Sequence, residues 1–158
     1  DYATNLLFGD AATATLLSLD GEMEFGPFEL YTNGTKSSAL ERKEGKITMN
    51  GREVFNFSRR SVPAAIDSFL AKHRIEKEKV DRFLFHQGSK IIVDEIQKAL
   101  KVKAANVPLQ LEGYGNTVSS SIPLLLETEI DSSEAKTFVL AGFGVGLSYG
   151  IGYLKKAN

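Results

Sequence analysis

The stretch "RFLFHQGSKIIVDEIQKALKV", residues Arg82–Val102, joins a short apolar run to a helical pattern. Phe83–Phe85 predict a buried strand, and His86 stands where that strand ends. From Ile91 onward, the apolar residues recur at helical spacing. In α/β folds the carboxyl end of a strand presents functional groups to a crevice. His86 is therefore a candidate site residue, although a hydrogen-bonded core histidine is the commoner explanation of one such residue.

The composition indicates one soluble globular unit. The chain has 158 residues, 42% apolar and 25% charged, which is enough for one compact core. A net charge of -1 with interspersed signs favours neither nucleic acid nor a membrane surface as a partner. The longest apolar run, Phe138–Leu147, is too short to span a bilayer, and no signal peptide is visible. The chain begins at Asp1 without a methionine, which suggests a cut polypeptide.

The cysteine and histidine content limits the chemistry. The chain has no cysteine, which excludes disulfides, thiolate metal sites and a cysteine nucleophile within it. Its two histidines, His73 and His86, fall in different predicted elements and form no recognisable metal-ligand set. His73 lies near the end of a predicted helix, where a solvated histidine is common. We therefore predict no metal site.

The first seventy residues predict two strands, an irregular region and a helix. Leu6–Phe8 and Ala12–Leu19 are β-rich runs separated by a Gly-Asp pair. Residues Gly21–Gly51 are rich in glycine and polar residues and predict irregular structure with one or two short strands. Arg52–His73 has apolar positions at helical spacing, and Pro63 should kink this helix or divide it.

The remaining residues continue an alternation of strands and helices. After the helix that follows His86 come a short run at Val107–Leu111, a glycine-rich turn and a helix at about Ser119–Glu129. Two strands follow, Thr137–Ala141 and Leu147–Leu154. The alternation predicts an α/β layered fold.

Two glycine-rich motifs add candidate site residues. In "GYGNT", residues 113–117, the Asn116 amide can donate to a ligand, but a turn former or helix cap is an equally good explanation. "GFGVGLSYG", residues 142–150, has four glycines in nine residues between two strands. That is more than a simple hairpin needs, and it suggests backbone held close to another backbone or to a ligand, with N–H groups free to face an oxyanion. It is not a dinucleotide-binding motif, because the spacing is wrong and a strand follows it.

Taken together, these motifs resemble the C-terminal half of thiolase-fold condensing enzymes, and most closely ketoacyl-acyl-carrier-protein synthase III. The residues that carry the resemblance are "FGDAATATLL" at 8–17, "HQGSKII" at 86–92, "GNTVSSSIP" at 115–123 and "GFGVGLSYG" at 142–150. The resemblance implies a mixed sheet with helices packed on its faces. Residues 1–20 would be strands from the end of the N-terminal half. Residues 21–158 would be the C-terminal domain, with a variable loop region at 21–51.

The resemblance also implies a reaction, a decarboxylative Claisen condensation of an acyl-CoA with a malonyl thioester on an acyl-carrier protein. A cysteine of the N-terminal half would carry the acyl group. His86 and Asn116 match the pair that donates hydrogen bonds to the enolate oxygen. Gly144, Val145 and Gly146 match the loop whose backbone N–H holds the acyl-cysteine oxyanion. Coenzyme A enters as the substrate thioester, and no other cofactor is implied.

Departures from the family pattern concern the carrier and the acyl group. Gly88 and Ser89 replace an Ala-Asn pair, and Ile91 takes a position that is usually basic. Ser89 and Lys90 thus remain as carrier-binding candidates. Val118 and Val145 replace small residues, which suggests a specialised acyl substrate. The family further implies a cytoplasmic homodimer in fatty-acid or related lipid biosynthesis.

Because the nucleophile is missing, this chain alone is predicted to be inactive. Residues Leu6–Leu17 should pair with the rest of the chain, with another copy or with the absent half, since a bare apolar strand edge would aggregate. If the resemblance holds, His86 and Asn116 should converge on one cavity bordered by the Gly144–Gly146 turn. Two alternatives remain, a noncatalytic half-fold interaction module and a related condensation such as hydroxymethylglutaryl-CoA synthesis. A cysteine upstream, at a strand-to-helix junction, would favour the enzyme.

Overall fold

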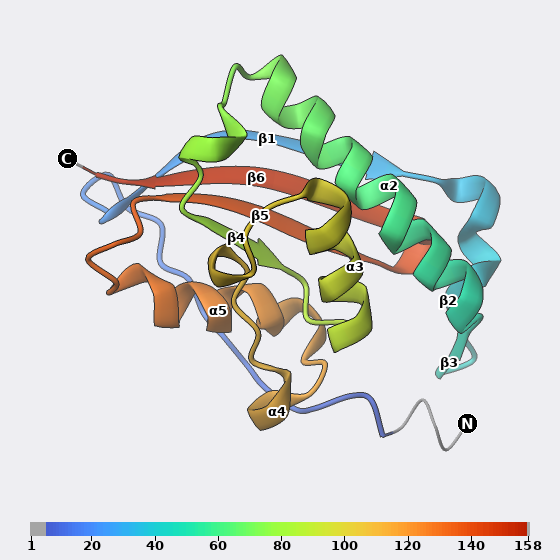
Figure 1. Cartoon of the computed structure of the whole chain (residues 1–158). Helices are drawn as coiled ribbons and strands as arrows, with labels where there is room; N and C mark the ends of the chain where they lie inside the picture. The colour runs from blue at the N-terminus through green and yellow to red at the C-terminus, as the bar shows by residue number, and fades with distance from the viewer. Residues whose placement is uncertain (1–5, 158) are drawn as a thin grey trace.

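The computed structural model describes residues 6–157, and a four-stranded mixed sheet is its central element (Figure 1). The strand order is β1-β6-β5-β4. The strands are β1 (Met23–Thr32), β4 (Arg82–Phe85), β5 (Thr137–Gly144) and β6 (Ser148–Lys156). β4 runs parallel to β5, whereas β6 is antiparallel to both β5 and β1. The predicted α/β class with a mixed sheet is confirmed.

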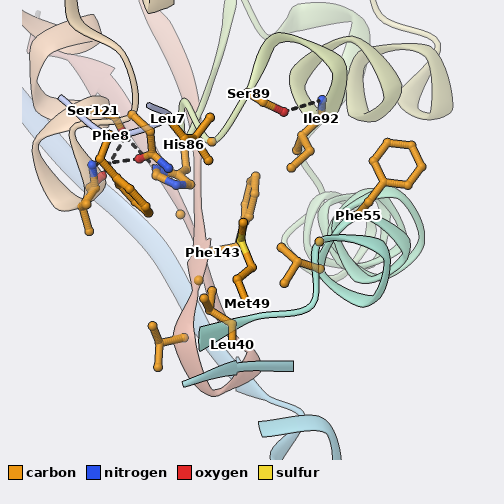
Figure 2. Close-up of a pocket in the computed structure, with 18 of the residues that line it drawn as sticks. Leu7, Phe8, Leu40, Met49, Phe55, His86, Ser89, Ile92, Ser121 and Phe143 are labelled. Atoms are coloured by element: carbon orange, nitrogen blue, oxygen red, sulfur yellow. Dashed lines mark hydrogen bonds between the residues drawn. The ribbon is translucent and has the colours of Figure 1, made fainter. Parts of the chain in front are cut away.

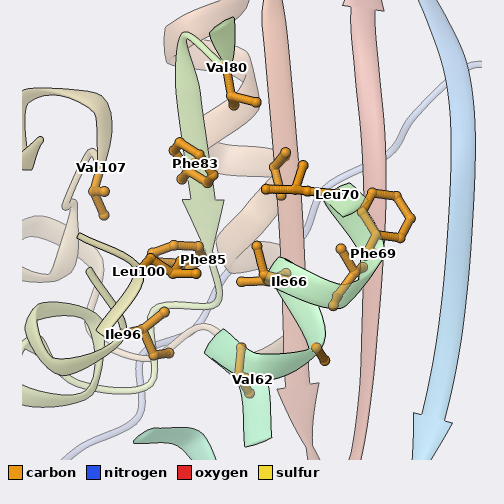
Figure 3. Close-up of a cluster of buried hydrophobic side chains, with 14 of the residues drawn as sticks. Val62, Ile66, Phe69, Leu70, Val80, Phe83, Phe85, Ile96, Leu100 and Val107 are labelled. Atoms are coloured by element: carbon orange, nitrogen blue, oxygen red, sulfur yellow. The ribbon is translucent and has the colours of Figure 1, made fainter. Parts of the chain in front are cut away.

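Helices cover both faces of this sheet. On one face α2 (Gly51–Lys72) and α3 (Lys90–Leu100) form the larger core with the strands (Figure 3). α5 (Ser121–Ile130) packs on the other face through Leu125. The side chains of β4 divide between the two cores: Phe83 and Phe85 enter the first and Leu84 the second. This is the alternation that a strand buried on both faces requires.

α2 runs without interruption across Pro63, so the predicted division of this helix is wrong. Its first turn is capped by Asn50, whose side chain accepts a hydrogen bond from the Glu53 N–H at 3.2 Å. Val62 and Ile66, on either side of the proline, are fully buried against the same core. Their packing offsets the cost of one lost helical hydrogen bond.

Residues 21–51 are more regular than predicted. β1 is a ten-residue strand that pairs with β6 along its length. β2 (Leu40–Lys43) and β3 (Lys46–Met49) form a separate hairpin, whose turn places Glu44 and Gly45 at φ values of 50° and 78°. A short 3₁₀ segment, Gly34–Ala39, links β1 to this hairpin. The expectation of irregular structure is wrong. Gly26 and Pro27 break the strand pattern in the sequence, but β1 accommodates them as a bulge and continues on both sides.

The predicted strand at Ala12–Leu19 is absent from the structure. These residues form no ladder, and Leu16 and Leu19 are almost fully exposed. Nearer the start, Phe8 makes one parallel bridge with Asn116. Residues 12–19 lack a neighbouring strand to pair with, so the strand prediction is wrong for the chain as it stands. The division of the protein at residue 20 stays a prediction.

The predicted short strand at Val107–Leu111 is also absent, because Pro108 has no N–H to give to a ladder. The chain there continues from a 3₁₀ turn, Ala104–Asn106, to the single turn of α4 (Leu111–Tyr114). The buried Gln87 side chain connects this segment to the end of β4. Its Nε2 donates to the Phe85 carbonyl at 2.8 Å, and its Oε1 accepts from the Gln110 N–H at 3.1 Å.

No helix within residues 6–157 is long and apolar enough to cross a membrane.

Candidate active site

His86 lies directly after β4, as predicted, and its ring is held on two sides. Its backbone N–H donates to the Ala141 carbonyl at 2.9 Å, which extends the pairing of β4 with β5 by one residue. Its Nδ1 lies 2.8 Å from the Ser121 hydroxyl, and its ring meets Phe143 edge-on with centroids 5.2 Å apart (Figure 2). Burial lowers the pKa of His86 from 6.5 to about 4, so the ring is neutral at pH 7.

Asn116 is buried in a turn that only glycines allow. Gly115 has φ 66° and ψ -160°, a conformation that is accessible essentially to glycine alone. A Cβ on Gly9 would lie 1.7 Å from the Tyr114 carbonyl oxygen, so Gly9 is also required. Through this close approach, Gly9 N–H donates to the Asn116 carbonyl, and Asn116 N–H donates to the Leu7 carbonyl, both at 3.0 Å. The N-terminal segment thus fixes the backbone of Asn116.

The Asn116 side chain is oriented by Val118. Its Oδ1 accepts from the Val118 N–H at 3.0 Å, which assigns the other end of the amide as the NH₂ group. That NH₂ group has no hydrogen-bond partner among residues 6–157. Val118 itself has φ 54°, a strained value for a β-branched residue that costs on the order of 1–3 kcal/mol. The turn therefore stores strain to present an amide donor.

His86, Asn116, Gly144 and Val145 line one cavity of about 540 Å³, whose remaining wall is mostly apolar. The apolar side chains come from the hairpin, from α2 and α3, and from the start of α5 and the end of β5: Leu40, Ile47, Met49, Val54, Phe55, Phe57, Ile91, Ile92, Ile122 and Phe143 (Figure 2). An apolar wall with a few polar groups is typical of a small-molecule site. The sequence prediction of a common cavity for His86 and Asn116 agrees with this arrangement, while their catalytic roles stay predictions.

Of the other predicted site residues, some line the cavity and others do not. Gly146 is not among the residues that line the cavity; its φ is 121°, and a Cβ there would meet the Ser148 hydroxyl at 2.4 Å. Ser89 does line the cavity, and it caps α3 by accepting from the Ile92 N–H at 3.4 Å. Lys90 does not; it is exposed and pairs with Asp94 at 2.6 Å. Their carrier-binding role stays a prediction.

Sequence reasoning missed Ser121 and Phe143, although both lie inside motifs that it singled out. Ser121 is the last of three consecutive serines, and nothing in that run distinguishes it. Phe143 follows the first glycine of the glycine-rich motif, where an aromatic residue suits an ordinary strand. Their contacts with His86 join different elements of the fold, so only the tertiary structure identifies them.

The depressed pKa of His86 predicts a pH dependence of stability. Between pH 6.5 and about 4 the unfolded chain binds a proton that the folded chain does not. The free energy of unfolding should therefore be highest above pH 6.5 and fall by on the order of 3 kcal/mol as the pH drops to about 4. Urea unfolding over this range should show a steeper slope in the wild-type chain than in His86→Gln, where Glu29, whose pKa its ion pair with Lys72 lowers to about 2, still contributes near pH 4. Equal slopes in both would contradict the assignment.

Comparison with known proteins places this chain in a family. Residues 70–156 match the family described as 3-Oxoacyl-[acyl-carrier-protein (ACP)] synthase III C terminal. The chain is 36% identical to a Beta-ketoacyl-[acyl-carrier-protein] synthase III of Gloeobacter violaceus, over 96% of this chain and 52% of the relative. It is 34% identical to a protein of the same name from Staphylococcus aureus, over 95% of this chain and 50% of the relative.

Solved structures agree with the sequence matches. The 3-oxoacyl-[acyl-carrier-protein] synthase III of Aquifex aeolicus superposes with a TM-score of 0.85 at 25% identity, covering 98% of this chain and 52% of that one. The synthase III of Thermus thermophilus gives 0.85 at 28% identity, covering 99% and 54%. The chain thus spans about half the length of the relatives it matches. This chain belongs to the 3-oxoacyl-acyl-carrier-protein synthase III family and corresponds to its C-terminal, thiolase-like half.

Proposed function

We propose that this chain is the C-terminal catalytic half of an acyltransferase that condenses an acyl-CoA with a malonyl thioester. The observation that carries the proposal is the shared cavity. A neutral His86 ring and an Asn116 amide with an unpaired NH₂ group line one apolar space. Two neutral donors in such a space suit a reaction in which negative charge develops on one oxygen.

The proposed chemistry proceeds through an enolate. Loss of carbon dioxide from the malonyl thioester leaves its electron pair on the α-carbon, delocalised onto the thioester oxygen. His86 and Asn116 would donate hydrogen bonds to that oxygen, each lowering the barrier by about 2.7–4 kcal/mol. The α-carbon would then attack the acyl-cysteine carbonyl, and the cysteine would leave as a thiolate. The Val145 N–H would hold the carbonyl oxygen during that attack.

The nucleophile has to come from outside this chain, because the chain has no cysteine. We propose that the other half of the protein supplies it, as the half-length coverage of the relatives supports. The substrates would be an acyl-CoA and a malonyl-acyl-carrier protein, with Ser89 and Lys90 near the carrier. The complete protein would act as a cytoplasmic homodimer in fatty-acid or related biosynthesis.

Labelled substrates test this function. The complete protein, incubated with an acyl-CoA labelled in the acyl group, should retain the label on a cysteine and then release carbon dioxide when malonyl-acyl-carrier protein is added. The chain alone should do neither, because it lacks the thiol. A complete protein that takes no label and releases no carbon dioxide would overturn the proposal.

A further inference from the structure

We propose that Ser121 is a positioning residue that sets the tautomer of His86, donating its hydroxyl hydrogen to Nδ1 so that Nε2 carries the ring proton. The inference rests on the proposed function, in which the nitrogen that meets the enolate oxygen must be a donor. A neutral imidazole has one N–H, so Nε2 can donate only if Nδ1 accepts.

The hydroxyl of Ser121 is the group that can donate a hydrogen bond to Nδ1. Ser121 is 3% exposed, and its Oγ lies 2.8 Å from Nδ1. No other side chain among residues 6–157 hydrogen-bonds to that nitrogen. The Gln87 N–H points to the same hydroxyl oxygen at 3.3 Å and occupies one of its lone pairs. The hydroxyl hydrogen is therefore the donor available to the ring.

That hydrogen has one competing acceptor, the Val118 carbonyl, 2.9 Å from the Ser121 Oγ. This carbonyl already accepts the backbone N–H of Ser121 itself, at the start of α5. It is thus satisfied without the hydroxyl, whereas an accepting Nδ1 would be left without a donor in a buried place. Since the proposed function requires Nδ1 to accept, we assign the hydroxyl hydrogen to the ring and not to this carbonyl.

Removal of the hydroxyl should exchange one tautomer of the His86 ring for the other. The Val118 carbonyl lies close enough to His86 to favour its protonated form. Without Ser121 Oγ, the ring proton would move to Nδ1 and face this carbonyl. Nε2 would then become an acceptor and would repel the enolate oxygen. Ser121→Ala should therefore slow decarboxylation by on the order of 10- to 100-fold, as loss of a histidine-orienting partner does elsewhere.

The ¹⁵N chemical shifts of the histidine rings test the inference directly, without any activity. The chain has two histidines, and His73 serves as an internal reference because its Nε2 lies 2.7 Å from the Glu29 carboxylate. At a pH where both rings are neutral, His86 should be the Nε2–H tautomer in the wild-type chain and the Nδ1–H tautomer in Ser121→Ala. Ser121→Thr keeps the hydroxyl and should restore Nε2–H.

Ser120→Ala is the matched control. Ser120 is the neighbouring buried serine, and its hydroxyl donates to the Ala11 carbonyl at 3.2 Å instead of to the ring. It should leave the His86 tautomer unchanged. A wild-type chain with His86 as Nδ1–H overturns the inference whatever the variants do, as does an unaltered tautomer in Ser121→Ala. An inactive complete protein whose His86 is nonetheless Nε2–H would sink the proposed function and leave the role of Ser121 standing.

Discussion

Asn116→Ala in the complete protein is expected to slow decarboxylation of the malonyl thioester by about 10²–10³-fold, the effect of losing one oxyanion donor. Acyl transfer to the cysteine should continue, because the enolate does not take part in that step. The substitution removes the NH₂ group at the cavity, while the backbone pairing of Asn116 with Leu7 and Gly9 needs no side chain. Rapid-quench measurement of acyl-cysteine and of released carbon dioxide separates the two steps.

Asn56→Ala provides the control for this experiment. Asn56 lies on α2 beside the cavity-lining residues but does not line the cavity itself. Alanine is favourable inside a helix, so both steps should keep their wild-type rates. If Asn116→Ala lowered acylation and decarboxylation equally, the assignment of Asn116 to the enolate would be wrong.

Phe69→Ala is expected to lower the free energy of unfolding by about 3–5 kcal/mol. Phe69 is fully buried in α2, within the core that joins this helix to α3 and the sheet (Figure 3). Its ring also packs against His73, with centroids 4.7 Å apart. Truncation removes apolar contacts on several elements at once and leaves a cavity that the rigid sheet cannot close.

Phe28→Ala is the matched control, because it makes the same change on the exposed face of β1. Phe28 is 70% exposed, so its truncation should change the free energy of unfolding by less than about 1 kcal/mol. Denaturant unfolding of both variants of this chain measures the difference. Similar losses in the two variants would show that the core around Phe69 is not packed as described.

Sequence predicts well those helices and strands whose formation depends on their own residues and on neighbours close in the chain. α3 separates its apolar and polar faces more strongly than α2 and α5 do, with Val93, Ile96 and Leu100 buried on one side. β5 and β6 are long β-rich runs joined by a turn, and their pairing is local. Periodicity alone therefore predicts these elements, since local preference and tertiary packing agree there.

Elements that depend on distant partners were not predictable in this way. β1 crosses the irregular pair Gly26 and Pro27, and only its pairing with β6 makes it one strand. Conversely, residues 12–19 have strand-forming composition but no partner in this chain. Strand formation is decided by pairing and burial, which composition does not report.

The same distinction between local and distant determinants applies to the residues of the candidate site. His86 and Asn116 stand out because a strand end and a glycine-rich turn mark them in the sequence. Ser121 stands among three serines, and its contact with His86 follows from the packing of α5 beside the end of β4. Sequence can therefore nominate the groups that meet a substrate, while the groups that orient them emerge from the fold.

The backbone bridge between Phe8 and Asn116 also determines where this polypeptide can be divided for engineering. A cut between residues 12 and 20 would leave Phe8 and Gly9 on the upstream fragment. That fragment would then have to return them to the Tyr114–Asn116 turn as a donated strand. Reassembly of the two pieces would be coupled to the position of Asn116. The exposed stretch at 12–20 is thus the place at which to divide the complete protein into a two-fragment reporter, in which recovery of the proposed activity would measure fragment association.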